Sequence, residues 1–317
     1  MISYYNSSTK KFFKKNSVSY FDGTTIISIV KNIPRFIKGK INYAEMWGTQ
    51  WKVYSKTQFD SFTKTDYSKH RLEYILGCSI KILKNKNVLE VGAGAGRFTE
   101  ILLKCGANVH SIDASQAVEC NYKNNKKISN KFKIAQADLH NIPYKDNSFD
   151  YVICIGVLQH IPCTLKGLRS IWSKVKKNGL LIIDHYQFTI GYYFSFLPIA
   201  RFFLKMLPAK YTIKITKLFV KFFFPILWAA RDNEKLVVLL KRIFPLGFAY
   251  NIRKNLTKKQ HYQWTELDTH DALTDPYKRL LTKKSFGRML NELGGKVELL
   301  SSLRPGGNGL EARIKKI

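Results

Sequence analysis

Acidic residues and cysteines are scarce in this chain of 317 residues. Asp and Glu together number 22 against 53 Lys and Arg, which gives a net charge of +31. The five cysteines include no Cys-x-x-Cys pair, so the spacing typical of zinc sites and of disulfide frameworks is missing. We therefore expect no metal site and a reduced, cytoplasmic setting.

Long hydrophobic runs are also lacking. The longest uncharged stretch near residue 190, from Tyr186 to Ala200, has 15 residues, contains Pro198 and is followed by Arg201. About 20 apolar residues are needed to cross a bilayer. Residues 1–15 mix polar, aromatic and lysine residues without the apolar centre of a signal peptide. The sequence thus predicts neither a membrane span nor a signal peptide.

The basic excess has two interpretations. It indicates an anionic partner, which could be nucleic acid, a phosphorylated substrate or a membrane surface. Alternatively it reflects codon usage, because 41 of the basic residues are Lys and only 12 are Arg, and Lys has A/T-rich codons. We favour codon usage for the total charge and expect no specific nucleic-acid partner.

Strands and helices are expected to alternate from residue 87 onward. The expected strands are 87–91, 109–112, 132–135, 151–155 and 180–183, and the expected helices between them are 98–104, 115–127 (with Ser115 as N-cap) and 165–175. A helix at 284–293 and a hairpin of 297–303 and 310–314 around Pro305–Gly309 complete the pattern. This order predicts an α/β fold with a doubly wound, Rossmann-like sheet.

Four parts of the chain are distinguished by composition. Residues 1–83 are expected to form an N-terminal segment and a helical cap that includes a helix at 68–83, and residues 84–187 the ligand-binding core. Residues 188–256 are apolar, aromatic and basic and are expected to form a helical insert or lid, and residues 257–317 to complete the core sheet.

The strongest motif is the sequence from Val88 to Arg97, VLEVGAGAGR. Glycines allow the chain to turn sharply and a ligand to approach the backbone, and the next helix points free N–H groups at that ligand. A dinucleotide site needs Gly or Ala where Arg97 stands. Glu90 before the glycines suits a cationic ligand better than a pyrophosphate.

Two carboxylates follow the next strands. Asp113 ends the second strand and Asp138 ends the third. Ligands bind at the carboxyl ends of parallel strands, where Asp113 could accept hydrogen bonds from ribose hydroxyls and Asp138 from an adenine amino group. The three features together indicate a nucleoside-containing ligand.

These segments resemble the class I S-adenosylmethionine-dependent methyltransferases, type 11-like, over about 100 residues. The likeness continues in residues 142–150, in GVLQHI at 156–161 and in Lys177–Gly179. The resemblance implies S-adenosyl-L-methionine as cofactor and one antiparallel strand in an otherwise parallel sheet. It also implies the cofactor-binding set Glu90, Gly92, Ala93, Gly94, Gly96, Asp113, Ala114, Ala137, Asp138, Leu139, Ile155 and Gly156.

The flanks are similar to a bacterial subset of that family often encoded near surface-glycan genes. The likeness rests on WGTQW at 47–51, KTQFD at 56–60 and WTELDTHD at 264–271. His270 stands where the subset usually has Phe, and Lys278 where it usually has Asp. The identity of the acceptor therefore does not carry over.

Candidates for the acceptor side come from three regions. His160 follows the fourth strand and could be a general base, or a histidine bonded to nearby backbone. His270 with Asp271 could form a base and its orienting carboxylate, or lie in a solvated loop. The expected substrate-binding residues are Gln50, Trp51, Gln58 and Trp264, which could instead form an aromatic core.

The expected function is methylation of an oxygen or nitrogen of a small molecule, such as a sugar or a lipid-linked glycan intermediate. The alternatives are a nucleic-acid methyltransferase and a non-catalytic, cofactor-binding scaffold protein. In the insert, Lys210, Lys214, Lys217 and Lys221 share one helical face. That face could bind the inner surface of an anionic membrane, or the helix could be an ordinary lid packed on the sheet or on a second subunit.

Overall fold

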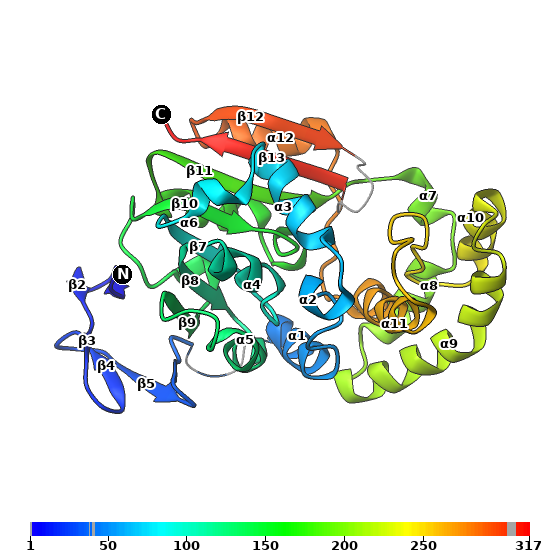
Figure 1. The fold of residues 1–317 in the computed structure, drawn as a ribbon, viewed down its shortest axis with the longest axis horizontal. Helices are drawn as coiled ribbons and strands as arrows, with labels where there is room; N and C mark the ends of the chain where they lie inside the picture. The colour runs from blue at the N-terminus through cyan, green and yellow to red at the C-terminus, as the bar shows by residue number, and fades with distance from the viewer. Residues whose placement is uncertain (1, 38, 40–41, 303–308) are drawn as a thin grey trace.

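The computed structural model describes residues 2–37, 39, 42–302 and 309–317. Its centre is a seven-stranded sheet in the order β12-β13-β11-β10-β7-β8-β9 (Figure 1). The strands are β7 (Asn87–Val91), β8 (Asn108–Asp113), β9 (Phe132–Gln136), β10 (Phe149–Cys154), β11 (Val175–Tyr186), β12 (Lys296–Ser302) and β13 (Gly309–Lys315).

The strand directions confirm the expected fold class. β7 to β11 pair in parallel, while β13 is antiparallel to both of its neighbours, β11 and β12. The expected hairpin strands are present, but most of the turn at Pro305–Gly309 lies outside the described residues.

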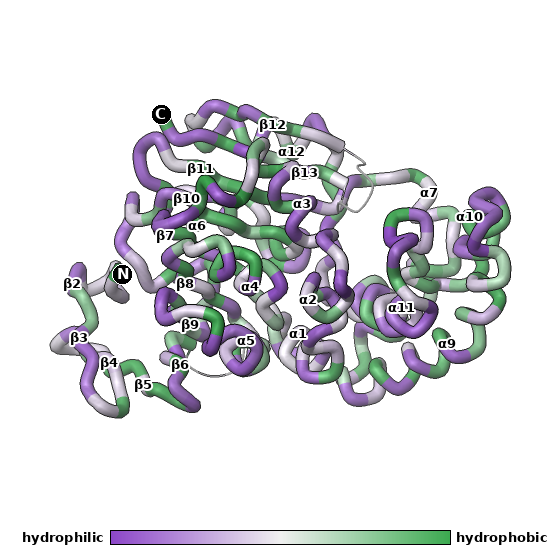
Figure 2. Tube along the Cα trace, in the orientation of Figure 1, coloured by the Kyte–Doolittle hydropathy of each residue, from purple (hydrophilic) through white to green (hydrophobic). Residues whose placement is uncertain are grey.

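Alternate residues of each strand pack on opposite faces of the sheet, because side chains in a strand alternate. Leu89 belongs to the core under α6 (Thr164–Lys174) and α12 (Lys283–Asn291). Its neighbour Val88 belongs to the core under α3 (Tyr67–Leu76) and α4 (Arg97–Lys104). α5 (Ala117–Asn125) packs beside α4. Green strands in Figure 2 mark this hydrophobic centre.

The N-terminal segment contains strands that the sequence pattern did not predict. They are β1 (Tyr5–Asn6), β2 (Lys11–Phe12), β3 (Lys14–Lys15), β4 (Ser19–Phe21), β5 (Ile26–Val30) and β6 (Ile33–Pro34), and they form a two-stranded and a four-stranded sheet. The helices of the cap begin later, with α1 (Asn42–Val53) and α2 (Asp60–Thr63).

Three expected boundaries were wrong for local reasons. The helix expected at 68–83 is divided, because Gly77 ends α3 in the left-handed conformation and η1 (Ile80–Leu83) follows. α5 begins at Ala117 with Gln116 as N-cap, although the Ser115 hydroxyl accepts from the Ala117 N–H at 3.1 Å while it donates to Asp113. β11 begins at Val175 rather than at Leu180 and passes through Asn178 at φ 62°.

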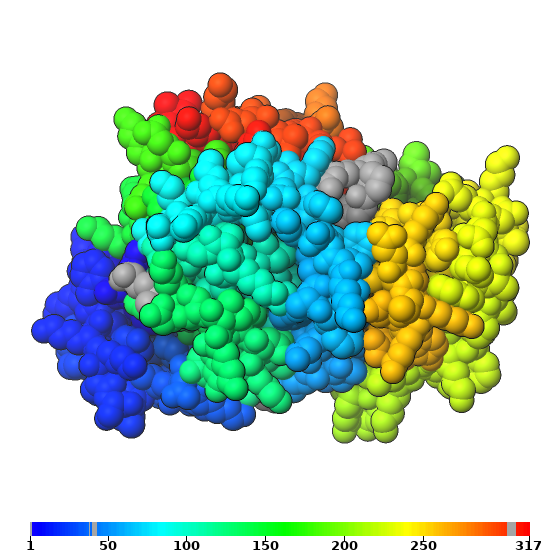
Figure 3. Space-filling model, viewed as in Figure 1, coloured from blue at the N-terminus to red at the C-terminus, as the bar shows by residue number. Residues whose placement is uncertain are grey.

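The insert forms the end of the molecule opposite the N-terminal strands (Figures 1 and 3). It contains α7 (Ile190–Tyr193), α8 (Leu197–Leu204), α9 (Ala209–Ala229) and α10 (Glu234–Ile243), and is followed by α11 (Lys258–Thr274). α9 and α8 pack on α11. Within the described residues, no helix combines the length and the apolar character that a membrane span requires.

Candidate cofactor-binding and active site

A cavity of about 600 Å³ opens at the carboxyl ends of the parallel strands. The turn between β7 and α4 forms its floor, and Gly92 and Gly94 adopt φ of 70° and 52°. A Cβ on Gly92 would lie 2.2 Å from a Val157 methyl group, and one on Gly94 would lie 3.0 Å from the Trp51 indole nitrogen. Only glycine therefore lets the backbone pass between these side chains.

Asp113 holds the glycine turn from the end of β8 while bordering the cavity. Its Oδ2 accepts a hydrogen bond from the Gly94 N–H at 2.8 Å. Its Oδ1 accepts from the Ser115 N–H at 2.8 Å and from the Ser115 hydroxyl at 2.6 Å. Burial raises the pKa of Asp113 above its usual value despite these donors.

Glu90 lies beneath the turn and does not line the cavity. Its side chain is 3% exposed, and Oε2 accepts hydrogen bonds from the hydroxyls of Thr99 at 2.5 Å and Ser111 at 2.7 Å. Burial raises the pKa of Glu90 to about 7. In this structure Glu90 braces β7, α4 and β8 against one another.

Asp138 also lies outside the cavity lining, although Ala137 and Leu139 on either side of it are part of that lining. Its Oδ1 accepts from the His140 N–H at 2.9 Å and contacts the His140 ring nitrogen Nδ1 at 2.9 Å. The adenine contact expected of Asp138 stays a prediction.

The remaining expected cofactor and substrate residues meet around the cavity, although they come from distant parts of the chain. Those that line it are Gly92, Ala93, Gly94, Gly96, Ala114, Ile155 and Gly156 on the cofactor side and Gln50, Trp51, Gln58 and Trp264 on the other.

Two arginines of the cavity wall were missed by sequence reasoning. Arg97 had been considered only as a departure from the dinucleotide pattern, yet it lines the cavity together with Arg71. Burial lowers the pKa of Arg97 to about 10. Arg71 pairs with Asp184 and Glu311, and Asp184 in turn accepts from the Gly156 N–H at 2.6 Å. Arg97 therefore offers a cationic group suited to a carboxylate, whereas the charge of Arg71 is balanced by its two partners.

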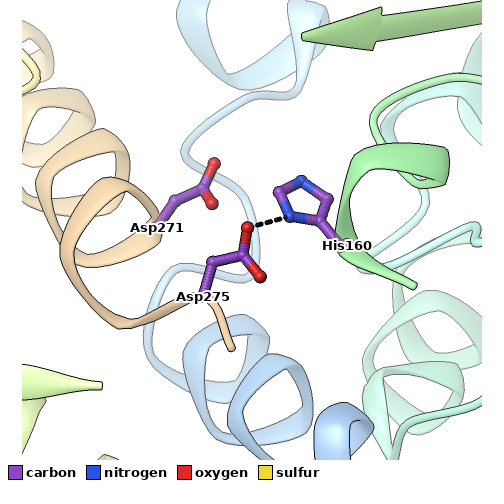
Figure 4. A group of neighbouring side chains, drawn as sticks. All are labelled: His160, Asp271 and Asp275. Atoms are coloured by element: carbon purple, nitrogen blue, oxygen red, sulfur yellow. Dashed lines mark hydrogen bonds and ion pairs between the residues drawn. The ribbon is translucent and has the colours of Figure 1, made fainter. Parts of the chain in front are cut away.

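His160 is buried beside the carboxylates of Asp271, in the last turn of α11, and of Asp275, which follows that helix (Figure 4). Its Nδ1 lies 2.7 Å from Asp275 Oδ2, and the Tyr186 hydroxyl donates to Asp271 at 3.0 Å. Burial alone would lower the pKa of His160, but the charge of Asp275 outweighs it and the pKa is raised. Asp275 is the residue directly after α11, so both carboxylates stand at the C-terminal end of this helix.

The expected pairing of His270 with Asp271 was wrong. Adjacent residues of a helix point about 100° apart, and the His270 nitrogens instead contact Gln50 Oε1 at 2.5 Å and Thr212 Oγ1 at 3.0 Å. Burial lowers the pKa of His270 to about 4, so its ring is neutral. His270 positions Gln50 in the cavity wall.

Ligand atoms of His160, Asp271 and Asp275 lie within 4.8 Å of one another, as they would around a metal ion. Lys278 is partly buried and also lines the cavity. Burial lowers the pKa of Lys278, and the charges of Asp271 and Asp275 oppose that shift. Because the Lys278 ammonium already supplies a positive charge there, we interpret the group as an acid–base site.

The fold is α/β, and its cavity opens over a glycine turn at the carboxyl ends of the parallel strands. Residues 89–183 match a protein-family model described as a methyltransferase domain. The match covers less than half of the chain, so this segment is similar to a methyltransferase domain.

Curated relatives match the chain in part. A ubiquinone biosynthesis O-methyltransferase from Actinobacillus pleuropneumoniae is 29% identical over 144 residues, which are 44% of this chain and 61% of the relative. One from Coxiella burnetii is 28% identical over 129 residues, 37% of this chain and 54% of the relative. The chain thus spans less than two thirds of either relative.

Solved structures resemble it more loosely. A SAM-dependent methyltransferase from Aquifex aeolicus is 14% identical, with a TM-score of 0.45 over 86% of this chain and 98% of that one. Magnesium protoporphyrin IX methyltransferase from Synechocystis is 14% identical, with a TM-score of 0.44 over 89% and 91%.

Proposed function

We propose that the protein methylates an oxygen atom of a small-molecule acceptor. The main observation in support of this proposal is that one cavity connects the glycine turn and Asp113 with the buried His160. A cofactor site and a base thus border the same space, as methyl transfer to a hydroxyl group requires. The name of the two curated relatives, O-methyltransferase, supports oxygen as the methylated atom.

The residues present fit S-adenosylmethionine, which supplies an electrophilic methyl group. The Asp113 carboxylate would accept from the ribose hydroxyls, and Ala137 and Leu139 would flank the adenine ring. Arg97 would carry the charge that binds the methionine carboxylate, with Arg71 beside it in the cavity wall. The cavity is large enough for a cofactor and an acceptor side by side.

His160 would remove the proton of the acceptor hydroxyl. Its Nδ1 is engaged by Asp275, which leaves Nε2 to accept the proton. Asp275 orients the ring and stabilises its protonated form. The Trp47 ring lies 4.6 Å from the His160 ring and shields this side of the site from water.

The acceptor class that we propose is a sugar or a lipid-linked glycan intermediate. Trp47, Trp51 and Trp264 line the cavity, and such rings can stack on sugars while Gln50 and Gln58 bind their hydroxyls. The glycan assignment otherwise rests on the sequence resemblance of the flanks, since the two curated relatives are named for ubiquinone biosynthesis.

The test compares glycan and lipid extracts of a deletion strain by mass spectrometry after complementation with wild type or His160→Asn. We expect one glycan or lipid species to lack a methyl group in the deletion strain and to regain it only with wild type. Restoration by His160→Asn would exclude the base. A missing methyl group on a nitrogen, or on RNA or DNA alone, would contradict the proposed acceptor.

A further inference from the structure

The insert exposes a large set of apolar side chains. Between residues 188 and 243 these are Phe188, Ile190, Tyr193, Phe194, Phe196, Ile199, Phe202, Phe203, Met206, Leu207, Tyr211, Leu218, Phe222, Ile226, Leu236, Val238, Leu239 and Ile243. Phe203 is 64% exposed and Phe222 62%. Apolar side chains exposed in such number within one segment indicate an interaction site, and we call the set the outer apolar face.

α9 shows how this face is built. One side of the helix, including Thr216, Val220 and Phe224, is buried, and α9 packs on α11. Tyr211, Leu218 and Phe222 recur at helical spacing on another side, which is exposed. An ordinary packed lid would bury the apolar residues of α9. Only part of them are buried, and others are exposed.

A row of lysines runs beside the exposed stripe. Lys210, Lys214, Lys217 and Lys221 are all exposed, and on a helical projection they lie between the buried side and the apolar stripe. The helix therefore carries three strips, of which one faces the protein, one is apolar and one is cationic.

The neighbouring helices α8 and α10 also expose apolar and basic side chains together. On α8, Ile199, Phe202 and Phe203 are exposed at spacings of three and four, and the exposed Lys205 follows the helix. On α10, Leu239 and Ile243 are exposed together with Lys235 and Arg242. Figure 1 places α9 and α10 at the end of the molecule farthest from the N-terminal strands.

The fold of the insert does not use the outer apolar face. Val220, Phe224, Leu227, Val237, Leu246 and Phe248 form a core of their own between α9, α10 and the following loop. The exposed side chains are therefore available to a partner.

The charge of the insert indicates which partner the outer apolar face would bind. Residues 188–256 contain twelve basic and two acidic residues, and one of the acidic ones, Asp232, pairs with the adjacent Arg231. A second copy docked through the same face would bring lysine rows together, which is unfavourable. An anionic phospholipid surface accepts both groups, since Phe side chains enter the headgroup region and lysines pair with phosphates.

We propose that the outer apolar face binds anionic membranes. The site lies close to this face, because α11, on which α9 packs, contributes Trp264, Leu267 and Asp271 to the cavity. A lipid-linked acceptor would thus be held next to the acceptor wall. Membrane binding itself does not depend on the proposed chemistry and is measured without turnover.

The test is co-sedimentation of the full chain with phosphatidylglycerol–phosphatidylcholine vesicles and with phosphatidylcholine vesicles at about 0.15 M salt, where surface charges are screened beyond about 8 Å. We expect strong binding to the anionic vesicles and weak binding to the neutral ones. Lys214→Glu with Lys221→Glu should lower the anionic partition at least about tenfold. Phe203→Ser with Phe222→Ser should lower binding to both.

The matched control is Lys84→Glu with Lys127→Glu, which changes net charge equally at exposed sites outside the insert. The control pair should bind vesicles like wild type. S-adenosylhomocysteine should raise the melting temperature of every variant, and this rise would show that each variant is folded. Negligible binding to both vesicle types, or equal loss in the control pair, would overturn the proposal. So would a dimer in sedimentation velocity that Phe222→Ser dissociates, without vesicle binding by wild type.

Discussion

The titration of one buried imidazole reports on the proposed base. Because the charge of Asp275 raises the pKa of His160, kcat should rise with pH as the ring loses its proton. Asp275→Asn removes that charge, so burial lowers the pKa of His160. The rising part of the pH profile of kcat should then move to lower pH, and the maximum kcat should fall. His160→Asn should lower kcat about 10²- to 10⁴-fold and abolish this rising part.

The pH profile of kcat is the measurement, and His261→Gln is the control, since the His261 ring packs against Trp228 and Tyr250 and does not line the cavity. If the rising part of the pH profile of kcat were unchanged in Asp275→Asn, Asp275 would not act on His160.

Glu90 makes folding stability depend on pH. Its pKa is raised by burial from 4.5 to about 7, so the folded state holds the proton at pH values where the unfolded chain has lost it. This contribution is complete below about pH 4.5 and is lost as the pH rises through 7.

Glu90→Gln, which keeps an oxygen for Thr99 and Ser111, should remove this pH dependence. Urea unfolding at pH 5 and pH 8 should show a difference in unfolding free energy smaller than in wild type, by on the order of 1–3 kcal/mol. Identical pH dependence in the two proteins would mean that Glu90 is ionised throughout.

The sequence predicted some residues of the site but not which of them contact one another. His160 was a candidate because of its place after the fourth strand, but its partner Asp275 is 115 residues away and only the packing of α11 brings it near. The pairing of His270 with Asp271 followed from adjacency in the chain, which a helix does not preserve in space. Arg71 and Arg97 carried no spacing signal.

At the level of elements, the turn after β7 is the most constrained. In Gly94→Ala the backbone would keep a left-handed residue at a cost of about 1–2 kcal/mol, and the new Cβ would press on the Trp51 indole. We expect lower thermal stability and about tenfold weaker S-adenosylhomocysteine binding by calorimetry.

Gly191→Ala is the matched control, because no heavy atom lies within 4 Å of its Cβ position. It should leave both quantities unchanged. Wild-type affinity in Gly94→Ala would place the ligand elsewhere.

The strands of the core could be predicted because each is an apolar run that ends at a glycine turn or an acidic residue. The strands of residues 5–34 could not, because they are two to five residues long and several are rich in lysine. They exist through pairing and packing, such as Tyr4 and Phe13 in the main core, and tertiary contacts of this kind leave no periodic pattern.

For the whole molecule, the net charge of +31 has two interpretations, and the salt dependence of DNA binding distinguishes a nucleic-acid enzyme from a small-molecule enzyme. We expect duplex DNA to bind weakly at low salt and to be released at about 0.15 M, because such binding is counterion release alone. Fluorescence anisotropy against salt concentration is the measurement. Tight binding that persists at this salt concentration would favour the nucleic-acid alternative.

The cavity on the glycine turn is the centre of the molecule's proposed activity, and ligand calorimetry tests it most directly. Wild-type protein should bind S-adenosylmethionine and S-adenosylhomocysteine and not NAD. Asp113→Ala should lose about 1.5–3 kcal/mol of binding free energy, while the exposed control Asp232→Ala should bind as wild type does. Binding of NAD instead, or wild-type affinity in Asp113→Ala, would contradict a cofactor site at Asp113 and the glycine turn.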